Sequence, residues 1–214
     1  MNAQLPVPGK FVTIEGGEGV GKSTNSDLLC ALLEARGIDV VVTREPGGTE
    51  LGEKLRSVLL SPTAQPPVAM AELLLIFAAR AQHLATVIEP ALTVGKWVLC
   101  DRFTDATYAY QGWGRELDQG AITALEQLVQ GERRPDLTVL LDMDPSEGLL
   151  RARERAALDR FEQEELAFFD RVRSGYLARA KVEPSRWMII DASKTLDEVK
   201  TALSEAFDHW LDHG

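Results

Sequence analysis

The sequence has few cysteines and no apolar segment of membrane length. Its two cysteines, Cys30 and Cys100, lie far apart and in no metal-ligand spacing, which favours free thiols in a reducing compartment over a disulfide or a metal site. The first ten residues, MNAQLPVPGK, contain no apolar run of the kind found in secretory signals. We therefore expect a cytoplasmic protein that has no membrane among its partners.

Positive charge is also scarce. The 214 residues include 23 Lys and Arg against 33 Asp and Glu, which gives a net charge of −10. Such a chain repels an extended phosphate backbone at long range, so nucleic acid is not an expected partner. A few local arginines could still hold a small nucleotide. The length fits one globular domain, 1–214, large enough to bury a sheet covered on both faces by helices.

Apolar strand-like runs alternate with helical patterns along the chain. This alternation predicts an α/β fold with three layers, in which a five-stranded parallel sheet is flanked by helices. Ligands bind such sheets at the carboxyl ends of the strands. Glycine-rich or polar segments follow every predicted strand, as this site would require. The predicted strands are 10–15, 38–43, 96–100, 137–142 and 186–191.

Three further segments carry more specific predictions. A long helix is expected from about Val68 to Thr86, with Pro90 near its end. The glycines at 112–114 predict a loop. A charged helical stretch is expected over about 146–181, because it combines helical periodicity with many charges of both signs.

The segment GGEGVGKS, residues 16–23, matches the phosphate-loop pattern G-x-x-x-x-G-K-[ST] between a predicted strand and a predicted helix. Backbone N–H groups and a helix N-terminus surround phosphates in such a loop. We expect Lys22 to reach the outer phosphates of a nucleoside triphosphate and the Ser23 hydroxyl to ligate Mg²⁺. Thr24 either adds a phosphate contact or only begins the helix. The predicted triphosphate-binding residues are Gly16, Gly17, Glu18, Gly19, Val20, Gly21, Lys22, Ser23 and Thr24.

Arginines near the other strand ends predict a second anion site, because guanidinium groups bind phosphate oxygens in a bidentate fork. Arg102 directly follows the third strand, Arg80 lies in the long helix, and Arg56 follows the REPGG turn. Arg44 fits the pattern as well as Arg56. Asp101 either orients the Mg²⁺ shell or caps the next helix, and we favour the metal role.

These segments together resemble the bacterial thymidylate kinases. The similarity covers nearly the whole chain and rests on GGEGVGKS, TREPGGT, FAARAQH, DRFTDATYAYQGWGR and LDRFEQE, in this order and spacing. It implies a doubly wound P-loop NTPase fold with a short helical lid at about 146–162. It also implies Mg²⁺-dependent transfer of the ATP γ-phosphoryl group to dTMP, giving dTDP and ADP in dTTP biosynthesis, and commonly a homodimer.

The resemblance also suggests how dTMP would be held. Arg80 matches the arginine that hydrogen-bonds thymine in the family, and Arg56 and Arg102 match the arginines on the dTMP phosphate. Thr107 and Tyr110 match positions lining the thymidine site, where the tyrosine crowds the ribose 2′ position and favours deoxyribose. The family carries an acidic residue near the sugar and phosphate at the position of Glu18, which would offset the charge of the converging arginines or orient a Mg²⁺-bound water.

One position departs from the family pattern. Many relatives have a phenylalanine that stacks on the base four residues before the thymine-binding arginine, where this chain has Ile76 followed by Phe77. A residue one position further along a helix points about a third of a turn away. We therefore expect Ile76 to contact the base and Phe77 to lie in the core.

The charged stretch RARERAALDRFEQE is either a solvated surface helix or a lid that brings an arginine to the transferring phosphoryl group. The phosphate loop has no arginine, and relatives of that kind carry the catalytic arginine in the lid. Arg155 matches that position, although Arg153 is an open alternative, and Arg151 and Arg160 are neighbours. The predicted catalytic residues are Lys22, Arg155, Arg102 and Glu18.

Two other functions share parts of this pattern. A deoxynucleoside kinase shares the fold and a DR element, but REPGG fits the monophosphate enzymes better. A GTP-dependent switch would need an N-K-x-D tetrapeptide and a glycine three residues after Asp101, and the sequence has neither.

Overall fold

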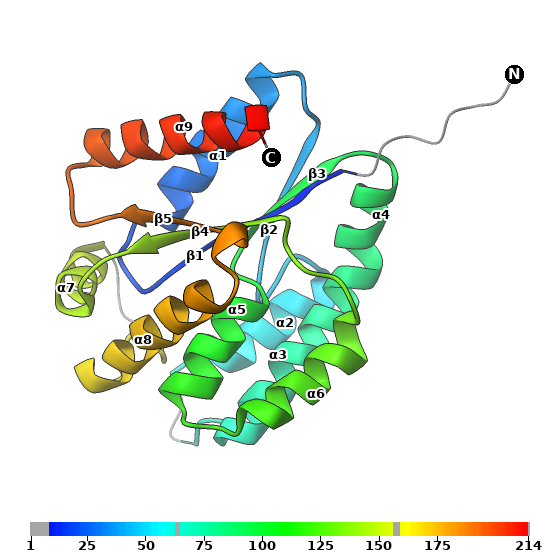
Figure 1. The fold of residues 1–214 in the computed structure, drawn as a ribbon. Coiled ribbons are helices and arrows are strands. Elements are labelled where there is room, and N and C mark those ends of the chain that lie inside the picture. Colours follow the sequence, from blue (N-terminus) through cyan, green and yellow to red (C-terminus); the bar gives the residue numbers. More distant parts are fainter. Residues whose placement is uncertain (1–8, 63–64, 156–158, 214) are drawn as a thin grey trace, which may run out of the picture.

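The computed structural model describes residues 9–62, 65–155 and 159–213, with the side chain of Arg155 excluded. Five parallel strands form one sheet, as predicted. Their order in the sheet is β2-β3-β1-β4-β5 (Figure 1). The second strand begins two residues later than expected, and the first, third and fifth begin one residue later. The strands are β1 (Phe11–Gly16), β2 (Val40–Arg44), β3 (Trp97–Asp101), β4 (Leu137–Asp142) and β5 (Trp187–Asp191).

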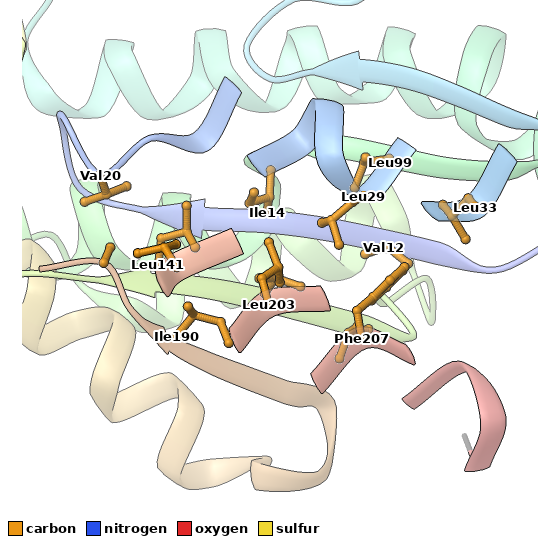
Figure 2. Close-up of a cluster of buried hydrophobic side chains, with 14 of the residues drawn as sticks. Val12, Ile14, Val20, Leu29, Leu33, Leu99, Leu141, Ile190, Leu203 and Phe207 are labelled. Atoms are coloured by element: carbon orange, nitrogen blue, oxygen red, sulfur yellow. The ribbon is translucent and has the colours of Figure 1, made fainter. Parts of the chain in front are cut away.

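Helices α1 (Lys22–Ala35) and α9 (Leu196–His213) cover one face of the sheet (Figure 1). Side chains alternate along a strand, so every second residue of β1 points to this face. Val12 and Ile14 pack there against Leu29 and Leu33 of α1 and Phe207 of α9, all fully buried (Figure 2). This cluster anchors the start of α1, and therefore the phosphate loop, to the middle of the sheet.

Most of the other helices lie on the opposite face (Figure 1). Here β1 presents Phe11, Thr13 and Glu15, and the helix α8 packs against η2 over many residues. Apolar clusters on this side join η2 and α8 to β4, and α3 to η2 and α6. The elements include α2 (Glu50–Leu60), α3 (Ala69–His83), α5 (Thr104–Thr107), η2 (Tyr108–Gly114), α6 (Gln119–Gln130) and α8 (Leu166–Val182).

The long helix extends beyond its predicted end. It continues from α3 through a π-helical turn, η1 (Leu84–Ile88), into α4 (Glu89–Thr93), where Pro90 lies in the first turn. Because the helix is continuous here, Pro90 removes one hydrogen bond to the preceding turn, which is where the π-helical turn η1 lies. By length and composition the segment Ala69–Thr93 could cross a membrane, but half of the apolar window is buried inside the protein, as in a core helix.

Two other predictions were wrong. The residues at 112–114 are not a loop but the end of the π-helical segment η2, which packs closely on α8. The charged stretch 146–181 is not one helix. It is divided into α7 (Pro145–Arg155), a turn at 160–163, and α8, while residues 156–158 lie outside the described part of the chain. The helix α7 lies at the carboxyl ends of β4 and β5 (Figure 1).

Candidate active site

The phosphate loop joins β1 to α1. Gly21, at the N-cap of α1, has a left-handed backbone, and no side chain caps the helix, so the first N–H groups face the adjoining cavity. Lys22 folds back over the loop and donates to the carbonyl oxygens of Gly17 at 2.7 Å and Gly16 at 3.3 Å. Burial, with the nearby charge of Arg102, lowers the pKa of Lys22.

The loop packs directly against α7. A Cβ atom on Gly19 would lie 1.9 Å from the carbonyl oxygen of Gly148, and one on Gly148 would lie 2.3 Å from that of Glu18. Neither distance is possible for a real side chain. Gly19 also has a φ of 69°, which L-residues rarely adopt. The backbone of α7 therefore packs directly on the phosphate loop.

Arg102 leaves the end of β3 with a φ of 68°, unusual for a residue other than glycine. Its Nη1 donates to the Gly16 carbonyl at 2.8 Å and to the Tyr176 hydroxyl at 3.0 Å. Its Nη2 donates to Glu18 Oε1 at 2.8 Å. The guanidinium carbon lies 4.7 Å from the ring centre of Tyr110. Arg102 is thus fixed beside the phosphate loop.

Glu18 has a structural explanation here. Its Oε1 accepts hydrogen bonds from Arg102 and, at 2.6 Å, from the hydroxyl of Tyr110. Burial raises the pKa of Tyr110 well above its ordinary value, so the phenol keeps the proton that it donates. A carboxylate inside an anion-binding loop is stable because a guanidinium group lies next to it.

Beyond this pair an open cavity of about 640 Å³ extends toward α3. Arg80 lies at its wall with 1% of its surface exposed. Its Nε donates to Glu45 at 2.7 Å and its Nη2 to the Thr107 hydroxyl at 2.9 Å, whereas its buried Nη1 has no partner. A buried donor without a partner is costly in a folded protein. The arrangement therefore leaves one face of Arg80 ready for an acceptor on a ligand.

Phe77 lies in the core, as expected. Ile76 lines this cavity, while Phe77 is 2% exposed and packs with Leu73, Tyr108 and Ile122. The cavity brings together all seven residues predicted to hold the acceptor nucleotide. Its predicted lining residues are Glu18, Arg56, Ile76, Arg80, Arg102, Thr107 and Tyr110.

Arg56 and Arg44, which the sequence could not distinguish, have different surroundings in the structure. Arg56 donates to the Pro46 carbonyl at 3.0 Å and lines both this cavity and the one over the phosphate loop. Arg44 lines only the latter, is half exposed and pairs with Glu53 at 2.9 Å. Arg56 is therefore better placed than Arg44 to contact a group between the two cavities.

The second cavity, about 1390 Å³ including open space, lies over the phosphate loop. Ser23, Thr24 and Asp101 line it, and Asp101 Oδ1 is buried without a hydrogen-bond partner. Mg²⁺ takes oxygen ligands and usually combines one or two protein groups with phosphates and water. Within the described ranges no three His, Cys, Asp or Glu side chains are grouped to hold a metal. A hydroxyl and an unpaired carboxylate oxygen beside a phosphate loop fit such a shared site.

The arginines of the predicted lid segment differ in their surroundings. Arg151 lines the phosphate-loop cavity and donates to the carbonyl of Ala192 at 3.1 Å. Arg153 is exposed. Arg160 turns away from the loop and pairs with buried Glu72 at 2.6 Å. Arg155 ends α7, and its side chain lies outside the described part of the structure.

Three site residues were missed from the sequence. Glu45 holds Arg80, and Glu15 and Tyr176 lie behind Arg102. Glu15 could have been noticed, because it is a carboxylate at the end of an otherwise apolar strand. Glu45 lies within the quoted REPGG segment. Nothing in the sequence distinguishes Tyr176 from a core tyrosine of α8.

Known proteins are similar to this chain in sequence and in fold. The family model described as thymidylate kinase matches residues 14–203. A thymidylate kinase of Pseudomonas syringae pv. tomato is 57% identical over 95% of this chain and 97% of its own length. One from Teredinibacter turnerae is 56% identical over 95% and 99%. A solved thymidylate kinase structure from Ehrlichia chaffeensis superposes with a TM-score of 0.76 at 36% identity, covering 94% and 99% of the two chains.

Proposed function

This chain belongs to the thymidylate kinase family, and we propose that its two adjoining cavities are where dTMP and ATP meet. As an ATP-dependent nucleoside monophosphate kinase, it phosphorylates dTMP to dTDP, a step of dTTP biosynthesis. The observation that best supports the proposal is Glu18, which lines both cavities and holds Arg102 between them.

In this proposal ATP lies along the phosphate loop, Gly16 to Thr24. The N–H groups at the start of α1 and the ammonium group of Lys22 bind its phosphates. Lys22 donates to the loop carbonyls of Gly16 and Gly17, and its ammonium group would exchange these two hydrogen bonds for contacts with an incoming phosphate. Mg²⁺, held by Ser23 and Asp101 with the phosphates, would offset negative charge as the phosphoryl group transfers.

The acceptor dTMP fills the other cavity. Arg80 donates its unpaired Nη1 to a carbonyl of thymine, Ile76 packs on the base, and Thr107 orients Arg80. Tyr110 closes the sugar region against a 2′-hydroxyl, since a packed ring leaves no space for one. Arg56 and Arg102 bind the acceptor phosphate and bring its oxygen into line with the γ-phosphorus.

The lid completes the site. We assign Arg155 as the cation that stabilises charge on the transferring phosphoryl group, because the phosphate loop itself contains no arginine. This places the chain in the subgroup with a lid arginine. Arg155→Ala should lower kcat by about 10³-fold, a typical effect of an arginine finger, with a much smaller change in KM for dTMP. An unchanged kcat in steady-state assays would refute the assignment.

Initial rates across a panel of acceptors test the proposed site. With ATP and Mg²⁺, dTMP should be the best acceptor, and thymidine should not be phosphorylated because it lacks the group that Arg56 and Arg102 bind. Arg80→Gln should raise KM for dTMP. Phosphorylation of thymidine would favour a deoxynucleoside kinase, and tight GTP binding without acceptor turnover would favour a switch protein.

We further propose a single-domain homodimer, 1–214, that works in the cytoplasm with ATP and dTMP as its partners. Support for a dimer comes from neighbouring helices α2 and α3, which expose Leu51, Val58, Met70 and Leu74 on the described surface. The two cysteines are unpaired thiols, which suits a reducing compartment. The lid of this domain corresponds to about 146–162.

A further inference from the structure

The backbone at Arg102 is in an unfavourable conformation. Within residues 9–62, 65–155 and 159–213, only Arg102 and Glu116 have a positive φ without being glycine. Side chains are rarely found in this region unless the surrounding structure holds them there. The turn at Arg102 should therefore have identifiable restraints.

Glu15 provides the first restraint. It lies on the face of β1 turned toward α8, with none of its surface exposed. Its Oε1 accepts the backbone N–H of Phe103 at 2.7 Å, the residue directly after the unfavourable turn. A buried carboxyl group is expensive unless its oxygens are hydrogen-bonded, so its presence in the sheet calls for a specific role.

Tyr176 links the same carboxyl group to the guanidinium group. Its hydroxyl donates to Glu15 Oε2 at 2.8 Å and accepts from Arg102 Nη1 at 3.0 Å. A guanidinium group only donates and a carboxyl oxygen can accept, so a hydroxyl between them can accept from the first and donate to the second. Tyr176 is 1% exposed, which shields these bonds from water.

We propose that Glu15 and Tyr176 are positioning residues that hold the backbone and the guanidinium group of Arg102 for the acceptor phosphate. This inference rests on the proposed contact between Arg102 and that phosphate. Glu15 fixes the turn through Phe103, and Tyr176 fixes one guanidinium nitrogen. Glu18 fixes the other nitrogen from the opposite side, so the head group is restrained before the nucleotide arrives.

The test compares dTMP with thymidine, which differ only in the phosphate. Calorimetric titration should show that Tyr176→Phe weakens dTMP binding by about tenfold, the effect expected when a hydrogen bond to a charged group is lost. Thymidine affinity should not change. Equal weakening of both ligands, or no change in either, would overturn the proposal.

Tyr108→Phe provides a matched control. Tyr108 is also buried, at 4% exposed, and its hydroxyl also donates to a carboxylate, that of Glu126. That pair does not line either cavity. The control should leave the ratio of the dTMP and thymidine affinities at the wild-type value, and a ratio that falls as far as in Tyr176→Phe would overturn the proposal.

A double-mutant cycle with Arg102→Ala separates this inference from the proposed function. Tyr176→Phe should have no further effect on dTMP affinity once Arg102 is removed, because it acts through that side chain. An additive effect would overturn the positioning role while leaving Arg102 at the phosphate. If Arg102→Ala alone leaves dTMP affinity unchanged, the proposed phosphate contact is itself wrong.

Glu15→Gln is a second variant that tests the same proposal by comparing dTMP with thymidine. Its amide oxygen can still accept from Phe103, but its amide nitrogen would replace the oxygen that faces Tyr176. It should weaken dTMP binding and spare thymidine, in the same direction as Tyr176→Phe. A selective loss confined to thymidine would contradict the proposal.

Discussion

The two arginines Arg80 and Arg102 are each held by several hydrogen-bond partners within the protein. Arg80 uses Nε on Glu45 and Nη2 on Thr107, which leaves Nη1. Arg102 is held by the Gly16 carbonyl, by Tyr176 and by Glu18. Such restraint reduces the entropy that ligand binding would otherwise cost.

Glu18→Gln tests this reasoning at the phosphate loop. The amide cannot offset the positive charge of Arg102 and could present its nitrogen to Tyr110. We expect kcat/KM for dTMP to fall by about 10- to 100-fold, the range for a lost hydrogen bond to a charged group. ATP affinity should stay near the wild-type value in equilibrium titrations. A loss confined to ATP affinity would show that Glu18 belongs to the triphosphate site instead.

Glu15→Gln makes a separate prediction about stability. Burial, and then the nearby charge of Asp105, raises the pKa of Glu15 from 4.5 to about 8. Between these values the folded protein keeps a proton that the unfolded chain has lost, so the free energy of unfolding falls as pH rises. Wild type should lose about 1.4 kcal/mol per pH unit more than Glu15→Gln over this interval. Urea unfolding from about pH 5 to 8 measures the difference, and parallel profiles would contradict it.

At the scale of elements, the contact between α7 and the phosphate loop depends on two glycines. Replacing Gly148 by alanine should normally favour a helix. Here the added Cβ would lie 2.3 Å from the Glu18 carbonyl oxygen, so either the loop or the helix must move. This contact therefore couples α7 to the phosphate loop.

We expect Gly148→Ala to lower the free energy of unfolding by about 1–3 kcal/mol, as for other overpacked sites, and to raise KM for ATP. Leu150→Ala is the control, because Leu150 lies on α7 with 60% of its surface exposed. Thermal unfolding and ATP-dependent initial rates measure both effects. If Gly148→Ala behaves like Leu150→Ala, α7 does not restrain the loop.

The elements that sequence predicted well are those with a local signal. Apolar runs located all five strands, and the phosphate-loop pattern located the start of α1. The glycines at 112–114 led to a wrong loop prediction, because they are needed for packing between two helices and not for a turn. A Cβ on Gly114 would lie 2.6 Å from the Phe168 ring, so this glycine allows η2 to pack on α8 instead of forming a loop. The charged stretch was predicted as one helical segment, because its periodicity does not show where α7 ends.

At the scale of the site, the sequence identified arginines that line the two cavities but not the side chains that hold these arginines in place. Arg80 and Arg102 lie in recognisable segments, whereas Tyr176 reaches Arg102 from 74 residues away. Such contacts depend on how α8 crosses the sheet. They could therefore be read only from the three-dimensional arrangement.

The whole molecule is expected to pair through α2 and α3. Leu74→Glu places a charge on this exposed apolar surface, where Leu74 is 50% exposed, and should yield monomers. Leu196→Glu is the control, since Leu196 is 52% exposed on α9, which covers the opposite face of the sheet (Figure 1). Light scattering should give twice the 23.5 kDa of one chain for wild type and the control. If the Leu74→Glu variant is still a dimer, the interface lies elsewhere on the molecule.

The central claim is that one continuous site holds thymine at Arg80 and the acceptor phosphate at Arg102, beside the phosphate loop. A crystal structure with dTMP and a non-hydrolysable ATP analogue tests it most directly. The account predicts a thymine carbonyl within hydrogen-bond distance of Arg80 Nη1, and the dTMP phosphate in contact with Arg56 and Arg102. A base bound away from Arg80, or a phosphate that neither arginine contacts, would contradict it.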